Sequence, residues 1–188
     1  KASWDEVYKI IKSKIKDTSK DKICGFVGDL INMEASFIFK EFFDRTININ
    51  NYESRSSQTY VDNSARENYL FNSTINGIEE SDLILLIGTN PRFEATMLNA
   101  RIRKAYLSNN TDIISLNDVG DLTYPYNSLD GKTQTIKDIT ENKNDISKKI
   151  LEANKPMIII GESFFNLKSA EYLFHNLKKF LFTNNKFS

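Results

Sequence analysis

Three short, mostly apolar runs along the chain each end at a glycine and precede a stretch with helical periodicity. They occupy residues 22–27 before Gly28, residues 83–87 before Gly88 and residues 157–160 before Gly161. Continuous apolar runs of this length are typical of strands that are buried on both faces. Strands that alternate with amphipathic helices join through right-handed crossovers into a parallel sheet. The pattern therefore predicts an α/β fold in which helices cover both faces of a sheet.

Helical periodicity and turn residues predict the remaining elements. Ser3 and Glu6 form a capping-box pattern before a helix whose apolar face carries Trp4, Val7, Tyr8, Ile11 and Ile15. Further helices are predicted at residues 33–45, 91–107, 145–153 and 165–182, with strands at residues 112–116 and, weakly, around Ile47 and Ile49. Residues 51–77 and 119–140 lack a clear period. A stretch as long as 51–77 is either bound to a partner or a surface loop.

Length and composition fit one folded domain. The chain has 188 residues, of which 40% are hydrophobic and 27% are charged, which is typical of a globular protein. We expect a single domain over residues 1–188, built on a doubly wound, mostly parallel, Rossmann-like sheet. The formal net charge of zero argues against a nucleic-acid-binding surface. No apolar run reaches the ~20 residues that a membrane helix needs.

The turn formed by Gly88, Thr89, Asn90 and Pro91 is the strongest candidate for a ligand site. Helix N-termini at the carboxyl edge of a parallel sheet present backbone N–H groups to ligands. Gly88 permits a tight turn, Asn90 can cap the following helix and Pro91 suits its first position. Structural roles alone also account for these residues. The G-x-G-x-x-G pattern and a Walker-type lysine are absent from all three turns, so nucleotide binding has no positive support.

The predicted helix after Pro91 carries apolar residues on two opposite sides. One side has Phe93, Met97, Ala100 and Leu107, and the other has Ala95, Leu98, Ile102, Ala105 and Tyr106. A helix with two apolar faces cannot lie half in water. One face is expected to cover the sheet, while the other meets either further protein or a second layer of this chain. Met97, Ile102 and Tyr106 are the candidate interface residues.

Cys24 and His175 are the only cysteine and the only histidine of the sequence. They cannot form a disulfide framework, nor an iron–sulfur or zinc cluster from this chain alone. Cys24 is expected to be a small core residue in the buried strand at residues 22–27. His175 is expected on the solvent-facing side of the last helix. We therefore predict neither a catalytic residue nor a metal site.

Several stretches of the sequence resemble one known family. Residues 83–95 and 99–104 closely resemble the C-terminal, molybdopterin-oxidoreductase-like region of the large iron–sulfur subunit of respiratory complex I, which is the mitochondrial 75-kDa subunit or its bacterial counterpart. Shorter matches follow in the family's order: Ser3-Trp4, Gly28-Asp29, Glu34-Ala35, and residues 68–72, 119–124 and 155–157. The resemblance thus covers nearly the whole chain.

The resemblance implies cofactors that lie outside this chain. The family carries 2Fe–2S and 4Fe–4S clusters in N-terminal domains that are missing here, while FMN and NADH belong to a neighbouring subunit. In related enzymes the turn that matches Gly88 to Pro91 lies near the nucleotide of a molybdopterin guanine dinucleotide. In complex I the scaffold is regarded as having lost this cofactor. The resemblance therefore implies no cofactor in this chain, with the turn as a remnant.

The resemblance also implies a role, partners and a location. The expected role is a non-catalytic scaffold segment that supports electron transfer from NADH to ubiquinone in the proton-translocating complex. Its partners would be the remainder of the same subunit and other peripheral-arm subunits. The location would be the matrix side of the mitochondrial inner membrane, or the cytoplasmic side of a bacterial membrane. The alternative is an oxidoreductase domain with a retained molybdopterin or nucleotide site.

The sequence departs from the family's pattern at two points. Thr96 stands where the family commonly has proline, in what is expected to be the first turn of a helix. The chain also stops after the last predicted helix, although the family's region continues. We therefore expect a truncated, cleaved or separately encoded piece of a larger subunit.

Overall fold

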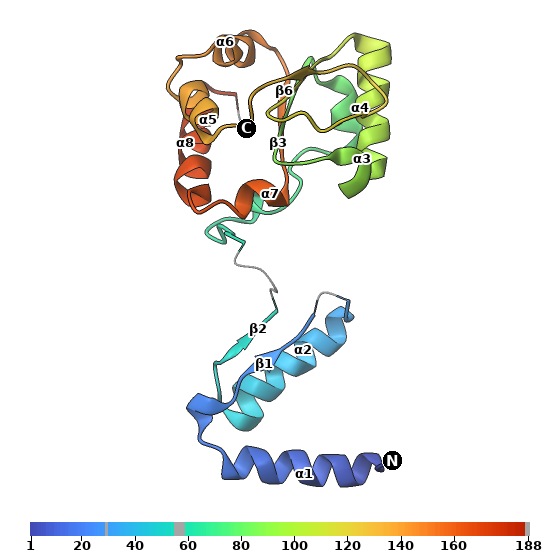
Figure 1. Cartoon of the computed structure of the whole chain (residues 1–188), viewed down its shortest axis with the longest axis vertical. Coiled ribbons are helices and arrows are strands. Elements are labelled where there is room, and N and C mark those ends of the chain that lie inside the picture. The colour runs from blue at the N-terminus through green and yellow to red at the C-terminus, as the bar shows by residue number, and fades with distance from the viewer. Residues whose placement is uncertain (29, 55–58, 187–188) are drawn as a thin grey trace. The chain divides into compact units, whose positions relative to one another are not determined.

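A four-stranded parallel sheet and a separate two-stranded parallel sheet organise the computed structural model (Figure 1). The structure describes residues 1–28, 30–54 and 59–186. Contacts divide the chain into two compact units, Lys1–Gln58 and Thr59–Ser188. The expectation of one domain over residues 1–188 stays a prediction. Asp29, which belongs to one of the family matches, and residues 55–58 of the predicted irregular stretch lie outside the described residues.

Among its described residues, the first unit contains two α-helices, α1 (Trp4–Asp17) and α2 (Met33–Glu41), and two short strands, β1 (Gly25–Phe26) and β2 (Tyr52–Glu53). It also has a 3-10 helix at Lys20–Lys22 and a π-helix at Phe42–Ile47. The second unit contains strands β3 (Leu83–Ile87), β4 (Asp112–Ser115), β5 (Asn127–Ser128) and β6 (Pro156–Ile160). Its α-helices are α3 (Pro91–Glu94), α4 (Thr96–Asn109), α5 (Thr133–Thr140), α6 (Asp145–Glu152), α7 (Glu162–Phe165) and α8 (Ala170–Thr183).

The four strands of the second unit are parallel, in the order β5-β4-β3-β6. The chain places β4 and β5 on one side of β3 and then returns to place β6 on the other. The strand order therefore reverses between β3 and β6, where ligands bind in open α/β sheets. All five residues of β3 are buried, because this strand is central and covered on both faces. This architecture confirms the predicted doubly wound α/β fold.

Alternate residues of β3 point into two hydrophobic cores. Ile84 and Leu86 face a core that contains Ile102 of α4 and Leu122 of the loop between β4 and β5. Leu83, Leu85 and Ile87 face the other core, which is built by α5, α6 and α8. Figure 1 shows these helices on the opposite side of β3 and β6 from α4. Helical period predicts an inner face of the last helix at Leu167, Ala170, Leu173, Phe174, Leu177 and Leu181. All of these except Leu167 are buried, whereas Leu167 precedes α8 and is 38% exposed.

The first unit has one small aromatic cluster. The rings of Phe39 and Phe43 lie 4.7 Å apart, and those of Phe43 and Tyr52 lie 5.6 Å apart, measured between centroids. They pack on Gly25, where an added Cβ would collide with the Phe43 ring. The predicted capping box of α1 is confirmed, since the Glu6 carboxylate accepts from the Ser3 amide at 2.7 Å. No residue of α1 is buried.

Three predictions for the first unit are wrong. The strand at residues 22–27 is reduced to β1, and Cys24 is exposed in front of it instead of forming part of the core. The strand around Ile47 and Ile49 is absent, because residues 42–47 continue α2 as a wider π turn. This turn ends at Asn48 in a left-handed conformation, with φ of 54°, and the second strand begins only at Tyr52. The apolar side chain of Ile49 is buried in a loop instead.

In the second unit the predicted helix at residues 91–107 is two helices. Ala95 separates α3 from α4 with φ of −150° and ψ of 68°, outside the helical region. Thr96 is therefore the first residue of α4, a position that proline also suits, which explains why both residue types fit there. The helix predicted at residues 165–182 is likewise divided into α7 and α8. Helix α5 and strand β5 lie in a region predicted as loop and were not expected.

Candidate functional site

The carboxyl edge of the sheet between β3 and β6 is closed by the two turns that meet there. Gly88 has φ of +61°, in the region that favours glycine, and a Cβ built on it would lie 2.6 Å from the Phe164 nitrogen. A Cβ on Gly161 would lie 2.5 Å from the Cβ of Thr89. The Ser163 hydroxyl also donates to the Gly88 carbonyl. The two turns are thus in direct contact where a ligand would enter.

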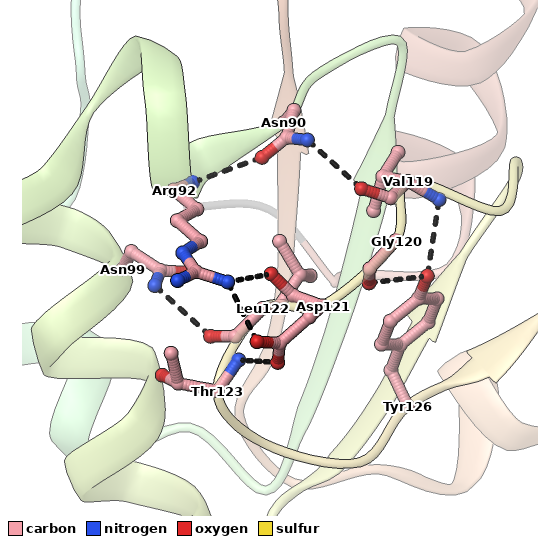
Figure 2. A network of polar contacts seen from close by, with 9 residues as sticks. All are labelled: Asn90, Arg92, Asn99, Val119, Gly120, Asp121, Leu122, Thr123 and Tyr126. Atoms are coloured by element: carbon pink, nitrogen blue, oxygen red, sulfur yellow. Dashed lines mark hydrogen bonds and ion pairs between the residues drawn. The ribbon is translucent and has the colours of Figure 1, made fainter.

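The polar side chains of the candidate turn bind to the chain itself. Asn90 caps α3 by accepting from the Arg92 amide at 3.2 Å, and its side-chain amide donates to the Val119 carbonyl at 2.9 Å (Figure 2). The Glu94 carboxylate accepts from the Thr89 hydroxyl at 2.7 Å and from the Asn90 amide at 2.9 Å. Pro91 is buried at the first helical position. The predicted capping roles of Asn90 and Pro91 are therefore confirmed.

Arg92 reaches the same loop through an ion pair. Its guanidinium donates to the carboxylate and to the backbone carbonyl of Asp121, each at 2.7 Å (Figure 2). The Thr123 amide, and then Arg92, hold the pKa of the Asp121 carboxyl below its usual range. The Asp121 carboxylate also stabilises the backbone of Thr123, which has a positive φ of 74°. The guanidinium of Arg92, the cationic group of the turn, is therefore already paired with a carboxylate of the same chain.

Two tyrosines complete the attachment of the loop at residues 118–126. The buried Asn99 of α4 donates to the Leu122 carbonyl at 3.1 Å and accepts from the Tyr124 hydroxyl at 2.7 Å. Burial raises the pKa of the Tyr124 hydroxyl. The Tyr126 hydroxyl accepts from the Val119 amide at 3.0 Å and lies 2.8 Å from the Asp118 carboxylate. Sequence reasoning assigned no role to Tyr124 or Tyr126, although part of the loop matched the family at residues 119–124.

The candidate interface residues of α4 have different environments. Met97 is 70% exposed, and Phe93 and Leu107 are comparably exposed. Ile102 is fully buried in the core under the sheet, so the prediction that it lies at an interface is wrong. Tyr106 is half-buried against the same core. The two-sided character of the helix is confirmed, with one side against the sheet and the other exposed.

Neither a metal-binding cluster nor a membrane-spanning helix occurs in the described part of the chain. Across residues 1–28, 30–54 and 59–186, no group of three or more histidine, cysteine and carboxylate side chains is arranged to hold a metal ion. Over those same ranges, no helix is long and apolar enough to cross a bilayer. His175 is exposed on α8, as predicted.

The switch point between β3 and β6, the glycine turns and the helices on both faces define a doubly wound, Rossmann-like α/β domain. The chain belongs to the molybdopterin oxidoreductase family, whose model matches residues 1–188. This match confirms the resemblance inferred from residues 83–95 and 99–104.

Three similar proteins are named as subunits of NADH-quinone or NADH-ubiquinone oxidoreductase. The chain is 35% identical over 164 residues to the G subunit of the NADH-quinone oxidoreductase of Rickettsia bellii, covering 87% of this chain and 24% of that protein. It is 33% identical over 172 residues to the NADH-ubiquinone oxidoreductase 75 kDa subunit of Reclinomonas americana, covering 85% of this chain and 25% of that protein. The corresponding NADH-quinone oxidoreductase subunit of Rickettsia prowazekii is 34% identical over 163 residues, with 87% and 24% coverage. The chain spans about a quarter of the length of these relatives.

The family name raises the question of whether a molybdopterin dinucleotide fits this edge. A dinucleotide needs free backbone N–H groups and space at the glycine turn. Here the Gly88 turn contacts Phe164, the Asn90 amide is bonded to Glu94, and Arg92 is paired with Asp121. The residues at this edge therefore do not fit the group. The expectation that the chain holds no cofactor stays a prediction.

Proposed function

We propose that this chain is a scaffold segment of the large iron–sulfur subunit of complex I, which supports electron transfer from NADH to ubiquinone without taking part in the chemistry. The observation that carries the proposal is the contrast between its closed ligand edge and its exposed apolar helix face. The relatives named as complex I subunits supply the context. A segment kept for its shape can lose a ligand site, but it must keep its packing surfaces.

The exposed face of α4 supports a role in assembly. Phe93 of α3 and Met97 and Leu107 of α4 expose large apolar side chains. Lys104 lies on the same side, and the Glu79 carboxylate pairs with its ammonium at 2.7 Å and also with the Arg101 guanidinium, so one anion is shared by two cations. Exposed large apolar side chains on one side of a helix support a protein–protein contact there. The partner would be another part of the peripheral arm, on the matrix side in mitochondria or the cytoplasmic side in bacteria.

The experiment is incorporation of the tagged chain into the parent complex, followed by native electrophoresis. Met97→Asp places a carboxylate in the proposed contact and should reduce incorporation by roughly ten-fold or more, since burying an unpaired charge is strongly unfavourable. Met97→Leu keeps the apolar surface and should incorporate normally. Because Met97 is exposed, both variants should fold with unchanged thermal midpoints. Normal incorporation of Met97→Asp would contradict the packing role.

The alternative, a retained cofactor site, has a separate test. Metal analysis of the purified parent complex should find no molybdenum in stoichiometric amount. A stoichiometric amount that disappears together with this chain would replace the scaffold proposal with an oxidoreductase role.

A further inference from the structure

A hollow, the α8 hollow, lies between the segment that begins the second unit and helix α8. It has a volume of about 360 Å³ and is lined by three aromatic residues, one histidine and two carboxylates: Tyr60, Tyr172, Phe174, His175, Asp62 and Glu171. Ligand pockets usually have volumes of ~300–1,000 Å³, so this hollow is at the lower end of the range. It therefore suits a single side chain better than a cofactor.

The aromatic floor of the α8 hollow is held in place by the core of the second unit. The Tyr60 amide donates to the Phe165 carbonyl at 3.0 Å, and the Tyr60 side chain packs against the core. Phe174 is buried, with its ring 5.5 Å from that of Phe165. Glu171 and Tyr172 lie in the first turn of α8, where both are exposed. The hollow thus has a preformed aromatic floor and an accessible rim.

One end of the α8 hollow already holds a cation of this chain. The Lys178 ammonium lies 5.4 Å from the centroid of the Phe174 ring and 3.2 Å from the Asp62 carboxylate. A carboxylate beside the face of an aromatic ring is an environment that attracts a cationic group. The charge of Asp62 is therefore compensated inside the chain.

Glu171, at the other end, has no such partner. Within the part of the chain that the structure describes, neither the Glu171 carboxylate nor the Tyr60 hydroxyl has a hydrogen-bond or ion-pair partner. Burial, followed by the negative charges of Asp62 and Glu171, raises the pKa of Tyr60. Both carboxylates thus act on the same hydroxyl, and only one of them is neutralised. The rim of the hollow carries an uncompensated negative charge next to aromatic rings.

We propose that the α8 hollow binds an arginine side chain of a partner polypeptide in the parent complex, with the guanidinium between the Glu171 carboxylate and the Tyr172 ring. This inference rests on the function proposed above. It adds a contact on α8, which Figure 1 shows on the opposite side of β3 and β6 from α4. A guanidinium can donate two hydrogen bonds to one carboxylate and stack on an aromatic ring, and it is less strongly hydrated than an ammonium. These properties favour arginine over lysine.

Glu171→Gln tests the charge while keeping the size of the side chain. Incorporation of the tagged chain into the parent complex should fall by about ten-fold or more, because a charge-assisted hydrogen bond is lost. Glu152→Gln, at an exposed glutamate of α6 outside the hollow, is the matched control and should incorporate like the wild type. Both residues are exposed, so the thermal midpoints of the isolated variants should be unchanged.

The wild-type chain separates failure of this inference from failure of the proposed function. If the wild-type chain does not enter the complex, the proposed function is wrong. If it enters and Glu171→Gln enters equally well, the function stands and the arginine contact is overturned.

Two variants of Tyr172 test the contribution of the ring. Tyr172→Leu keeps an apolar side chain but removes the aromatic face, and it should lower incorporation by about two- to five-fold. Tyr172→Phe keeps the face and should behave like the wild type. Equal incorporation of both variants would contradict the stacking of the guanidinium on this ring.

Phenylglyoxal, a reagent that modifies arginine, identifies the partner group. In the complex with the wild-type chain, one arginine of the partner should be protected. In the complex that still forms with the Glu171→Gln chain, modification of the same arginine should be about ten-fold faster, as measured by mass spectrometry. If the reactivity of no arginine changes, or if a carbodiimide joins Glu171 to a lysine, the occupant is not a guanidinium and the proposal is overturned.

Discussion

The two units of this chain differ in how many of their apolar side chains they bury. The second unit buries the large aliphatic residues of β3 and β4 in two cores on either side of the sheet, and Ile158, Ile159 and Ile160 of β6 pack partly buried against them. The first unit buries only two hydrophobic side chains among its described residues, Phe43 and Ile49. It exposes aromatic or long aliphatic side chains on both of its helices, including Trp4, Tyr8 and Phe37.

This difference separates a self-supporting fold from a surface that needs a partner. A domain is stabilised by the apolar area that it removes from water, and the first unit removes little. Its α1 has a complete capping box and a clear apolar face but no buried residue. Local sequence signals thus form the helix, while the described residues of the unit cover its apolar face only in part, at Val7 and Ile15. Exposed apolar surface of this extent is typical of interaction sites.

The largest expected contrast comes from truncating one apolar side chain in each unit. Leu85→Ala in the centre of β3 should destabilise the protein by about 2–5 kcal/mol, because it removes a fully buried side chain and leaves a cavity. Phe37→Ala, at an exposed position, should change stability by no more than about 0.5 kcal/mol. Urea unfolding followed by circular dichroism measures both.

Leu85→Met is the matched control, since it conserves volume and should cost less than about 1.5 kcal/mol. A loss from Phe37→Ala as large as that from Leu85→Ala would mean that the first unit has a core of its own, and the comparison between the units would fail.

A smaller contrast comes from two glycines that follow strands. A methyl group at Gly161 would overlap the Thr89 side chain and the Gly88 backbone, so Gly161→Ala should cost about 1–3 kcal/mol. Gly28 has open space around the position of a Cβ, and its backbone lies outside the left-handed region. Gly28→Ala should therefore stabilise slightly, by about 0.4–1 kcal/mol, through the lower entropy of the unfolded chain. Thermal unfolding of both variants would show opposite signs, and equal losses would contradict the closed edge at Gly161.

The same difference explains which parts of the fold could be predicted from the sequence. The strand β3 is five consecutive aliphatic residues, so its burial on both faces was visible in the pattern itself, whereas β6, with a similar apolar run at the edge of the sheet, is mostly half-buried. The strand β1 is short and lies beside an exposed Cys24, because its unit provides little cover. Periodicity predicts which side chains prefer burial, and it cannot say whether the chain supplies something to bury them against.

The remaining failures of prediction depend on long-range contacts or local backbone geometry. Helix α5 contains three threonines in eight residues, which weakens its helical signal, yet burial of Ile136 and Ile139 stabilises it. The closure of the candidate site depends on Asn90 and Arg92, whose partners lie 29 residues further along the chain. The polar Asn99 is buried in α4, where it bonds to Leu122 and Tyr124 of a distant loop, and helical periodicity gives no sign of such a contact. The motif at residues 88–91 predicts the position of the turn, but it does not predict the distant groups that bond to its side chains.

The smallest expected effect is an acid-dependent loss of stability in the second unit. The Ser64 hydroxyl and amide, with a further contribution from Lys178, lower the pKa of Asp62 to about 2. The Thr135 hydroxyl and the side chain and amide of Lys132 lower the pKa of Asp130 to about 2 as well. In the unfolded chain an aspartate titrates near ~3.9. The unfolded state therefore binds more protons in this range, so the stabilisation is complete above about pH 4 and is lost as the pH falls through about 2.

Asp62 also connects the start of the second unit to α8, through its ion pair with Lys178 at 3.2 Å. Chemical denaturation at a series of pH values should show a declining free energy of unfolding between about pH 4 and pH 2. Asp62→Asn should flatten this decline, and Ser64→Ala should do so in the same window by removing the hydroxyl that contributes most to the shift. An unchanged slope in both variants would mean that this carboxylate does not couple protonation to folding, and that the second unit is held by its cores alone.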